Sequence, residues 1–146
     1  MKRFVKRSLA VCLVAAAVLT SAAGAKVQPA FTFGRRGGTI RPFTVKIFPD
    51  GRVLATGAIR IIEHVTVTPE ALAALRKLAN AEHFFAIRAY TDCHGTVGGL
   101  ASNYIRVRLG RRAKTVSVRG GCNKRFLELF DVLQAVAAVS TTPKNP

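Results

Sequence analysis

The chain is poor in acidic residues and carries none of the common catalytic signatures. It has seven aspartates and glutamates against 23 lysines and arginines. The carboxylates show no paired spacing of the kind that glycoside hydrolases use. The glycine-rich stretches 37–38 and 95–99 are not followed by Gly-Lys-Ser or Gly-Lys-Thr, which argues against a phosphate-binding loop. No serine stands in a Gly-x-Ser-x-Gly context, and Ser102 and Ser117 have no local sign of activation.

The histidines and the Cys-His pair are the remaining candidates for chemistry. His64, His83 and His94 could act as acids or bases, but no local pattern assigns any of them a partner. A free Cys93 beside His94 would be a conceivable nucleophile. An exported half-cystine with polar neighbours explains the same residues more simply. We therefore favour a protein that is not an enzyme, and we expect no cofactor.

The first 25 residues have the features of a secretory signal. A basic start with Lys2, Arg3, Lys6 and Arg7 precedes an apolar run over 8–20, and Ala23-Gly24-Ala25 forms a small-x-small cleavage site. The run is shorter than the roughly 20 residues that a membrane-spanning helix needs. An uncleaved anchor is the alternative. Cleavage would start the mature chain at Lys26, export it to the periplasm or the medium, and leave no transmembrane span.

Only two cysteines remain after this cleavage, because Cys12 lies in the signal. An even count in an oxidising compartment predicts a disulfide between Cys93 and Cys122. Closing a loop of about 30 residues is worth about 3.6 kcal/mol in the chain-entropy model. The alternative is a metal site that adds His94, but the sequence has no paired Cys-x-x-Cys spacing and such a site needs reduced thiols. We expect no metal.

The mature chain is long enough for one domain. We expect a flexible lead-in over 26–41, rich in turn residues and carrying Arg35 and Arg36, with a short edge strand near Phe31 and Phe33 as the alternative. A single domain should follow over 42–140, and a disordered tail over 141–146.

Hydrophobic periodicity predicts the elements of this domain. Alternating residues from Phe43, the turn Pro49-Asp50-Gly51 and the return to Ala55 form a hairpin, and a third strand is expected over 59–67. Thr68 as N-cap, Pro69 and Glu70 begin a helix that should end near Ala81. Leu72, Leu75, Leu78 and Ala79 form its apolar stripe, and Phe84 and Phe85 should plug the core beside its end.

The second half has a similar layout, but its residues do not align with those of the first half, so no repeat is inferred. Strands over 104–109 and 115–119 flank the turn Gly110-Arg111-Arg112, and Asn123 caps a final helix. The apolar residues of that helix recur at helical spacing: Phe126, Phe130, Leu133 and Val136. The order ββ(β)α-ββα predicts an α+β fold, an antiparallel sheet with two helices on one face.

Most of the mature chain resembles a known group of proteins. The resemblance lies in the hairpin from Phe43, the helix from Thr68, and the second hairpin with its flanking motifs Cys93-x-Gly95-Thr96 and Gly120-x-Cys122. In these features the chain looks like small secreted bacterial proteins of unknown function. The resemblance implies export, one disulfide and one compact domain. It implies no activity and no functional residue.

The charge suggests the class of partner. Four basic residues lie in the signal, so the mature chain keeps 19 basic and seven acidic residues, a net charge of +12. Such an excess favours an anionic polymer, an acidic protein or a membrane surface. Strand alternation should place one stripe on the outer face of the second hairpin and its tip, consisting of Tyr104, Arg106, Arg108, Arg111, Arg112 and Arg119. Equally, these residues could form an ordinary solvated sheet face without a binding role, since the whole chain is basic.

Two functions from different classes follow from these patterns. The first is a secreted domain that binds an anionic partner in the envelope or outside the cell. The second is a secreted protein-binding module, such as a protease inhibitor, that uses the disulfide-anchored loop 91–102. An envelope hydrolase ranks below both. Binding through charge should weaken steeply with salt, whereas the second kind of contact should not.

Overall fold

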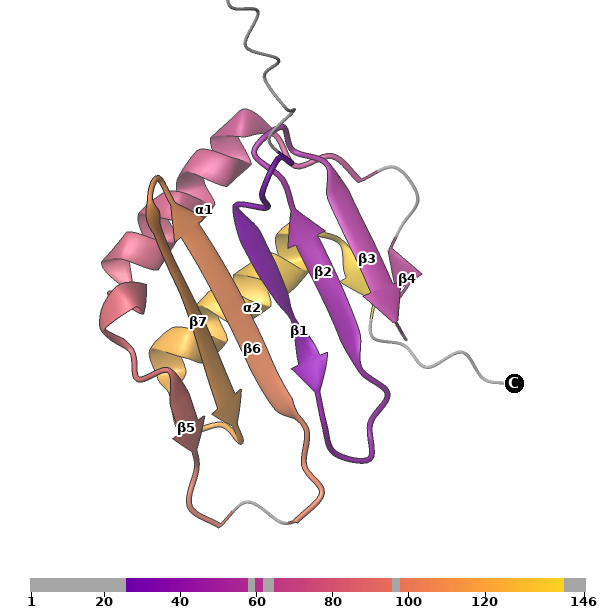
Figure 1. The fold of residues 1–146 in the computed structure, drawn as a ribbon, viewed down its shortest axis with the longest axis vertical. Coiled ribbons are helices and arrows are strands. Elements are labelled where there is room, and N and C mark those ends of the chain that lie inside the picture. Colours follow the sequence, from indigo (N-terminus) through magenta and orange to yellow (C-terminus); the bar gives the residue numbers. More distant parts are fainter. Residues whose placement is uncertain (1–25, 58–59, 62–64, 96–97, 141–146) are drawn as a thin grey trace, which may run out of the picture.

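The computed structural model describes residues 26–57, 60–61, 65–95 and 98–140. The predicted signal over 1–25 and the predicted tail over 141–146 lie outside the described residues. The described chain forms a six-stranded sheet backed by two helices, so the α+β prediction is confirmed (Figure 1). The strands run in the order β3-β2-β1-β6-β7-β5. Their bounds are β1 Phe31–Arg36, β2 Phe43–Ile47, β3 Val53–Gly57, β5 Tyr90–Asp92, β6 Ser102–Leu109 and β7 Arg112–Arg119.

Strand β1 corrects the prediction of a flexible lead-in over 26–41. It lies in the middle of the sheet, antiparallel to β2 on one side and to β6 on the other (Figure 1). Phe31 and Phe33 are fully buried. The nearby glycines pointed to a loop because they make the turn after β1, where Gly37 and Gly38 have φ of 70° and 69°. The strand itself is stabilised by pairing with segments distant in sequence, which a local pattern does not contain.

The hairpin from Phe43 is confirmed as β2 and β3. Asp50 closes its turn by accepting hydrogen bonds from the backbone N–H and the side chain of Arg52. The side-chain hydrogen bond from Arg52 is the main reason that the pKa of Asp50 lies below its ordinary value. Gly51 has φ of 85°, and a Cβ there would overlap the carbonyl oxygen of Val67, so the turn requires glycine.

The third strand predicted over 59–67 is not seen as one element of this sheet. Residues 58–59 and 62–64 of the segment are outside the described residues. β4 (Arg60–Ile61) pairs with β8 (Val139–Ser140) in a separate two-stranded sheet. Thr66 forms an isolated bridge to Arg52. Of the predicted segment, Arg60–Ile61 and Thr66 thus have β pairing, and the partner of each depends on the tertiary fold.

Both helices begin where their capping residues predict. In α1 (Pro69–Ala81), Thr68 Oγ1 accepts a hydrogen bond from the Ala71 N–H at 3.2 Å. In α2 (Lys124–Val136), Asn123 Oδ1 accepts one from the Phe126 N–H at 3.1 Å. These bonds satisfy N–H groups that have no acceptor within the helix. Phe84 begins the short 3-10 turn η1 (Phe84–Ala86) and is fully buried, while Phe85 is half-buried.

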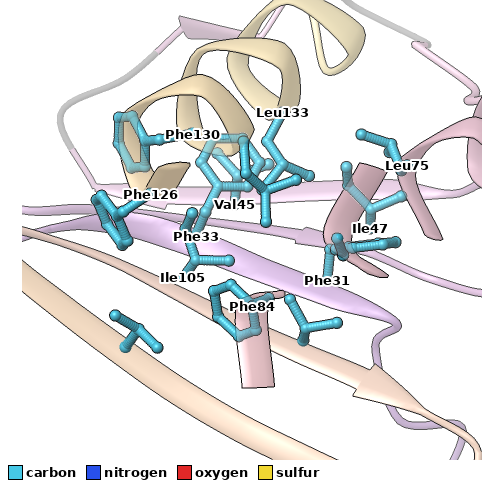
Figure 2. Close-up of a cluster of buried hydrophobic side chains, with 14 of the residues drawn as sticks. Phe31, Phe33, Val45, Ile47, Leu75, Phe84, Ile105, Phe126, Phe130 and Leu133 are labelled. Carbon is cyan, nitrogen blue, oxygen red and sulfur yellow. The ribbon is translucent and has the colours of Figure 1, made fainter. Parts of the chain in front are cut away.

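The core lies between the sheet and the helices. Phe126 and Phe130 on α2 stack with ring centroids 5.9 Å apart, and Phe130 meets the ring of Phe33 edge-on at 5.8 Å (Figure 2). Leu133 and the strand residues Val45 and Ile105 are also fully buried. The predicted inward face of α2 is therefore confirmed for Phe126, Phe130 and Leu133. Strand β2 and the middle of β6 bury alternate residues on this side, which leaves the other alternate set on the opposite face.

The second hairpin is confirmed as β6 and β7, and the disulfide is present. Cys93 and Cys122 are joined, with their Cα atoms 5.6 Å apart. Cys93 follows β5, which runs parallel to β7, whereas Cys122 lies between β7 and α2. The sheet is thus mostly antiparallel rather than purely so. The disulfide attaches a three-residue edge strand to the end of its neighbour, close to the start of α2.

Candidate anion-binding face

The side of the sheet opposite α2 is the candidate functional surface, called here the open face. Figure 1 views the molecule from this side, with α2 behind the strands. Cross-strand pairing places Thr32, Lys46, Leu54 and Arg106 side by side on it, one from each of β1, β2, β3 and β6. Leu54 is 49% exposed. The helices cover the other side of the sheet, and no described helix lies over the open face (Figure 1).

Charge is distributed unevenly between the sheet and the helices. Strands β1, β2, β3, β6 and β7 contain no acidic residue. Pairing places five cations on the open face: Arg36, Lys46, Arg106, Arg108 and Arg119. The acidic residues of the described chain lie elsewhere. Four are in or beside the helices: Glu70, Glu82, Glu128 and Asp131. Asp50 lies in the β2–β3 turn, and Asp92 lies in β5. The open face therefore carries a local excess of positive charge.

A polar cluster built over a glycine occupies the middle of the open face. Gly34 on β1 lies between Thr44 on β2 and Tyr104 on β6 in the pairing register. The Tyr104 and Thr44 hydroxyls are 2.6 Å apart, so the tyrosine side chain reaches across β1 where no side chain stands in its way. A Cβ at position 34 would overlap the carbonyl oxygen of Phe43. The close approach of strands β1 and β2 and the tyrosine bridge thus both depend on this glycine.

Arg36 completes the cluster. Its guanidinium carbon lies 5.2 Å from the centre of the Tyr104 ring, within the range of a cation–π contact. Its Nη2 donates a hydrogen bond of 2.7 Å to Ser117 Oγ on β7. Ser117 is 3% exposed although it belongs to the open-face register. Three strands are linked by side chains here, and they hold an exposed arginine in a defined position.

Two further cations flank this cluster on the row of paired residues Lys46, Thr32 and Arg106. Lys46 and Arg106 stand two strands apart, which corresponds to roughly 10 Å between their backbones. Arg106 is exposed and Lys46 is half-exposed. Such spacing lets two anionic groups of one extended ligand be contacted at once.

The six residues of the predicted stripe do not all lie on the same face of the sheet. Tyr104, Arg106, Arg108 and Arg119 share the open face, as predicted. Arg112 is a correction, because its guanidinium stacks 4.2 Å from the Phe85 ring and pairs in register with Leu109 on the helix side of the sheet. Arg111 is exposed in the turn beyond β6. Strand alternation itself places Arg112 on the helix side, because β7 begins at Arg112 and this residue has the same parity as the buried Val116 and Val118.

Arg119 contributes less positive charge than its position suggests. Its Nη1 lies 3.3 Å from Asp92 Oδ2, and both side chains are partly exposed. Asp92 also accepts a hydrogen bond from the Tyr90 hydroxyl at 3.4 Å. The carboxylate offsets part of the charge at this end of the open face. The stronger cationic region is the one around Arg36, Lys46 and Arg106.

The local pattern around Arg36 did not reveal its role. The sequence places Arg35 and Arg36 next to glycines, which led to their assignment to the flexible lead-in. In the structure Arg35 Nε donates to Asn103 Oδ1 at 3.0 Å on the helix side, while Arg36 points to the open face. Extending the alternation of Phe31 and Phe33 through Arg36 could have predicted that both arginines belong to this strand and lie on opposite faces of it.

The loop after β5 is linked to the loop after β1. The Thr39 N–H donates to the Gly99 carbonyl at 3.0 Å, which joins the two loops at one end of the sheet. Ile40 and Leu100, one from each loop, are 48% and 37% exposed. Residues 96–97 of the predicted contact loop 91–102 lie outside the described residues. The described parts of the two joined loops together present two exposed apolar side chains, Leu100 from the predicted contact loop and Ile40 from the loop after β1.

The remaining candidates for chemistry form no site that the structure brings together. His83 and His94 are exposed, and His64 lies outside the described residues. Among the residues that the structure describes, no group of three or more histidine, cysteine, aspartate or glutamate side chains could hold a metal ion. Within the same residues, no helix has both the length and the apolar character to cross a membrane.

Comparison with known proteins adds no assignment. No protein-family model matches the chain, and no curated protein matches it. The resemblance to small secreted bacterial proteins therefore stays a prediction. Any function must be inferred from the surfaces described above.

Proposed function

We propose that this protein is a secreted, non-enzymatic domain whose open face binds an anionic polymer in the envelope or outside the cell. One observation carries the proposal: five strands contain no acidic residue, and four of them place five cations on a single face. The opposite face is covered by helices that contain or adjoin four of the six described acidic residues. An anionic chain lying on the open face would meet attraction along its length and little repulsion.

The side-chain chemistry of the open face suits phosphate, sulfate or carboxylate groups. Guanidinium groups offer planar pairs of donors that match such anions. Arg36 is already held by Tyr104 and Ser117, so less conformational entropy is lost when it binds. Thr32 and Thr115 stand on either side of Arg106 in the register and supply neutral hydroxyl groups. A row that mixes cations and hydroxyls favours an extended polar polymer over an apolar surface.

The test removes two cations from the open face and two from the helix side. The first variant carries Lys46→Gln and Arg106→Gln, and the matched control carries Lys77→Gln and Arg125→Gln, both exposed helix residues. Affinity for a polyphosphate of defined length is measured over a range of salt concentrations. For nucleic acids each contact adds about 0.7–0.9 to the slope of log K against log salt, so losing two contacts should lower the slope by about 1–2.

The open-face variant should bind more weakly than the control, and both should keep the melting temperature of the parent protein. Equal losses of affinity in the two variants would show that only the total charge matters. That result would refute the open face as a site.

The second candidate is a protein-binding module centred on the loop 91–102. Exposed Ile40 and Leu100 on the two joined loops favour it, because paired apolar side chains at a loop end suit a protein contact. Its binding would change little between low and high salt. The salt series above therefore separates the two functions once a partner is in hand.

A further inference from the structure

A separate hollow lies at the opposite end of the sheet from the joined loops. It has a volume of about 500 Å³ and lies between α1, the β2–β3 turn, the chain before β1 and the tip of the β6–β7 hairpin. Figure 1 shows this hairpin tip beside α1. The volume falls within the range of about 300–1,000 Å³ that small-molecule sites occupy. The side chains used below are Gln28, Pro49, Arg76, Asn80, Arg108 and Leu109.

Two cations from different elements border the hollow. Arg76 stands on α1, one turn before Asn80, so the two side chains share a helix face. Arg108 stands on β6, where its backbone N–H donates to the Ala30 carbonyl at 2.9 Å. Among the residues that the structure describes, none of those lining the hollow is acidic. The ion pairs found in the described chain join Arg52 to Asp50 and Arg119 to Asp92, so neither Arg76 nor Arg108 is neutralised by one.

The rest of the lining contains both polar and apolar groups. Gln28 and Asn80 supply amide donors, while Pro49 and Leu109 supply apolar contact. The hollow also borders the C-terminal half of α1, and the partial negative charge of that helix end works against an anion. Both guanidinium groups are therefore needed to make an anion favourable here. Two arginines with nearby amides match the charge and the acceptors of a dianionic phosphate.

We infer that this hollow binds a small phosphomonoester, with the phosphate between Arg76 and Arg108 and a short apolar part against Pro49 and Leu109. This site does not rest on the proposed function. Arg108 borders both surfaces, but Arg76 and Asn80 belong to α1, which packs on the covered side of the sheet. The ligand also differs in kind, because a hollow of this size holds one small molecule rather than a polymer.

The test titrates the mature protein with phenyl phosphate, inorganic phosphate and benzoate, and follows backbone amide shifts by NMR. Phenyl phosphate should bind saturably and shift the amides of Gln28, Asn80, Leu109 and Gly110. It should bind more tightly than inorganic phosphate, which lacks an apolar part, and more tightly than benzoate, which carries one charge instead of two. Arg76→Gln should weaken phenyl phosphate binding at least tenfold.

Two control variants keep the inference falsifiable. Lys77→Gln removes a neighbouring charge of α1 outside the lining and should change the affinity less than twofold. The double change Lys46→Gln with Arg106→Gln should also leave phenyl phosphate binding intact, so failure of the open face and failure of the hollow can be told apart. Four results would each overturn the inference. Phenyl phosphate could fail to bind saturably, or its amide shifts could spread over the open face. Benzoate could bind as tightly as phenyl phosphate, or Arg76→Gln and Lys77→Gln could lose equal affinity.

Discussion

Replacing Phe130 by alanine should remove the aromatic contact that joins α2 to the centre of the sheet. Phe130 is 2% exposed and touches two rings, stacked on Phe126 and edge-on to Phe33 (Figure 2). Burying a phenylalanine side chain is worth about 1.5–3 kcal/mol, and each aromatic pair adds about 0.5–1.5 kcal/mol. These contributions agree with the loss of about 3–5 kcal/mol that emptying a core aromatic site causes.

The measurement is equilibrium unfolding in urea, followed by circular dichroism, with the disulfide kept intact. The midpoint should fall while the denaturant slope stays unchanged, because the two variants expose similar surface on unfolding. Glu128→Ala, an exposed change on the same helix, should alter the stability by no more than about 0.5 kcal/mol. A loss below about 1 kcal/mol for Phe130→Ala would mean that α2 does not pack on the sheet through this residue.

Two further predictions concern the polar cluster and the disulfide. Tyr104→Phe should cost about 0.5–1.5 kcal/mol, because it removes the hydrogen bond with Thr44 and leaves the threonine hydroxyl without that partner. A double-mutant cycle with Thr44→Val should show coupling between the two positions, and strict additivity would contradict the bridge over Gly34. Cys93→Ala should lower the free energy of unfolding by about 2–5 kcal/mol, measured in the same urea assay, because it frees β5 from the end of β7. Stability equal to that of the parent protein would show that β5 is held by its pairing and packing alone.

Local patterns predicted the elements whose signals are complete within a short segment. Thr68 and Asn123 both cap helices because an N-cap side chain bonds to a backbone N–H only three residues away. The turn at Asp50-Gly51 follows from one side chain and one backbone conformation. The inward face of α2 follows from the spacing of Phe126, Phe130 and Leu133 along a single helix.

The candidate site was only partly visible by the same means. Alternation along β6 correctly placed Tyr104, Arg106 and Arg108 on one face, because residues two apart in a strand point the same way. It could not reveal that β1 lies beside β6, since that pairing joins residues about 70 positions apart in the chain. The roles of Arg36 and Lys46 on the open face were therefore missed. Arg112 was misplaced because it was assigned to the turn, whereas it is the first residue of β7 and shares the helix-side parity of Val116, which brings its side chain to Phe85.

The sequence by itself determined the helices, the two hairpins, the inward-facing residues of α2 and the pairing of Cys93 with Cys122. Each depends on contacts within one segment or, for the disulfide, on the two cysteines that lie outside the predicted signal. Only the tertiary structure decided the strand order, the central place of β1, the parallel edge strand β5 and the gathering of cations from β1, β2 and β6 on one face. These features arise when distant segments compete to bury apolar surface and satisfy backbone hydrogen bonds, and the outcome of that competition is a property of the whole chain.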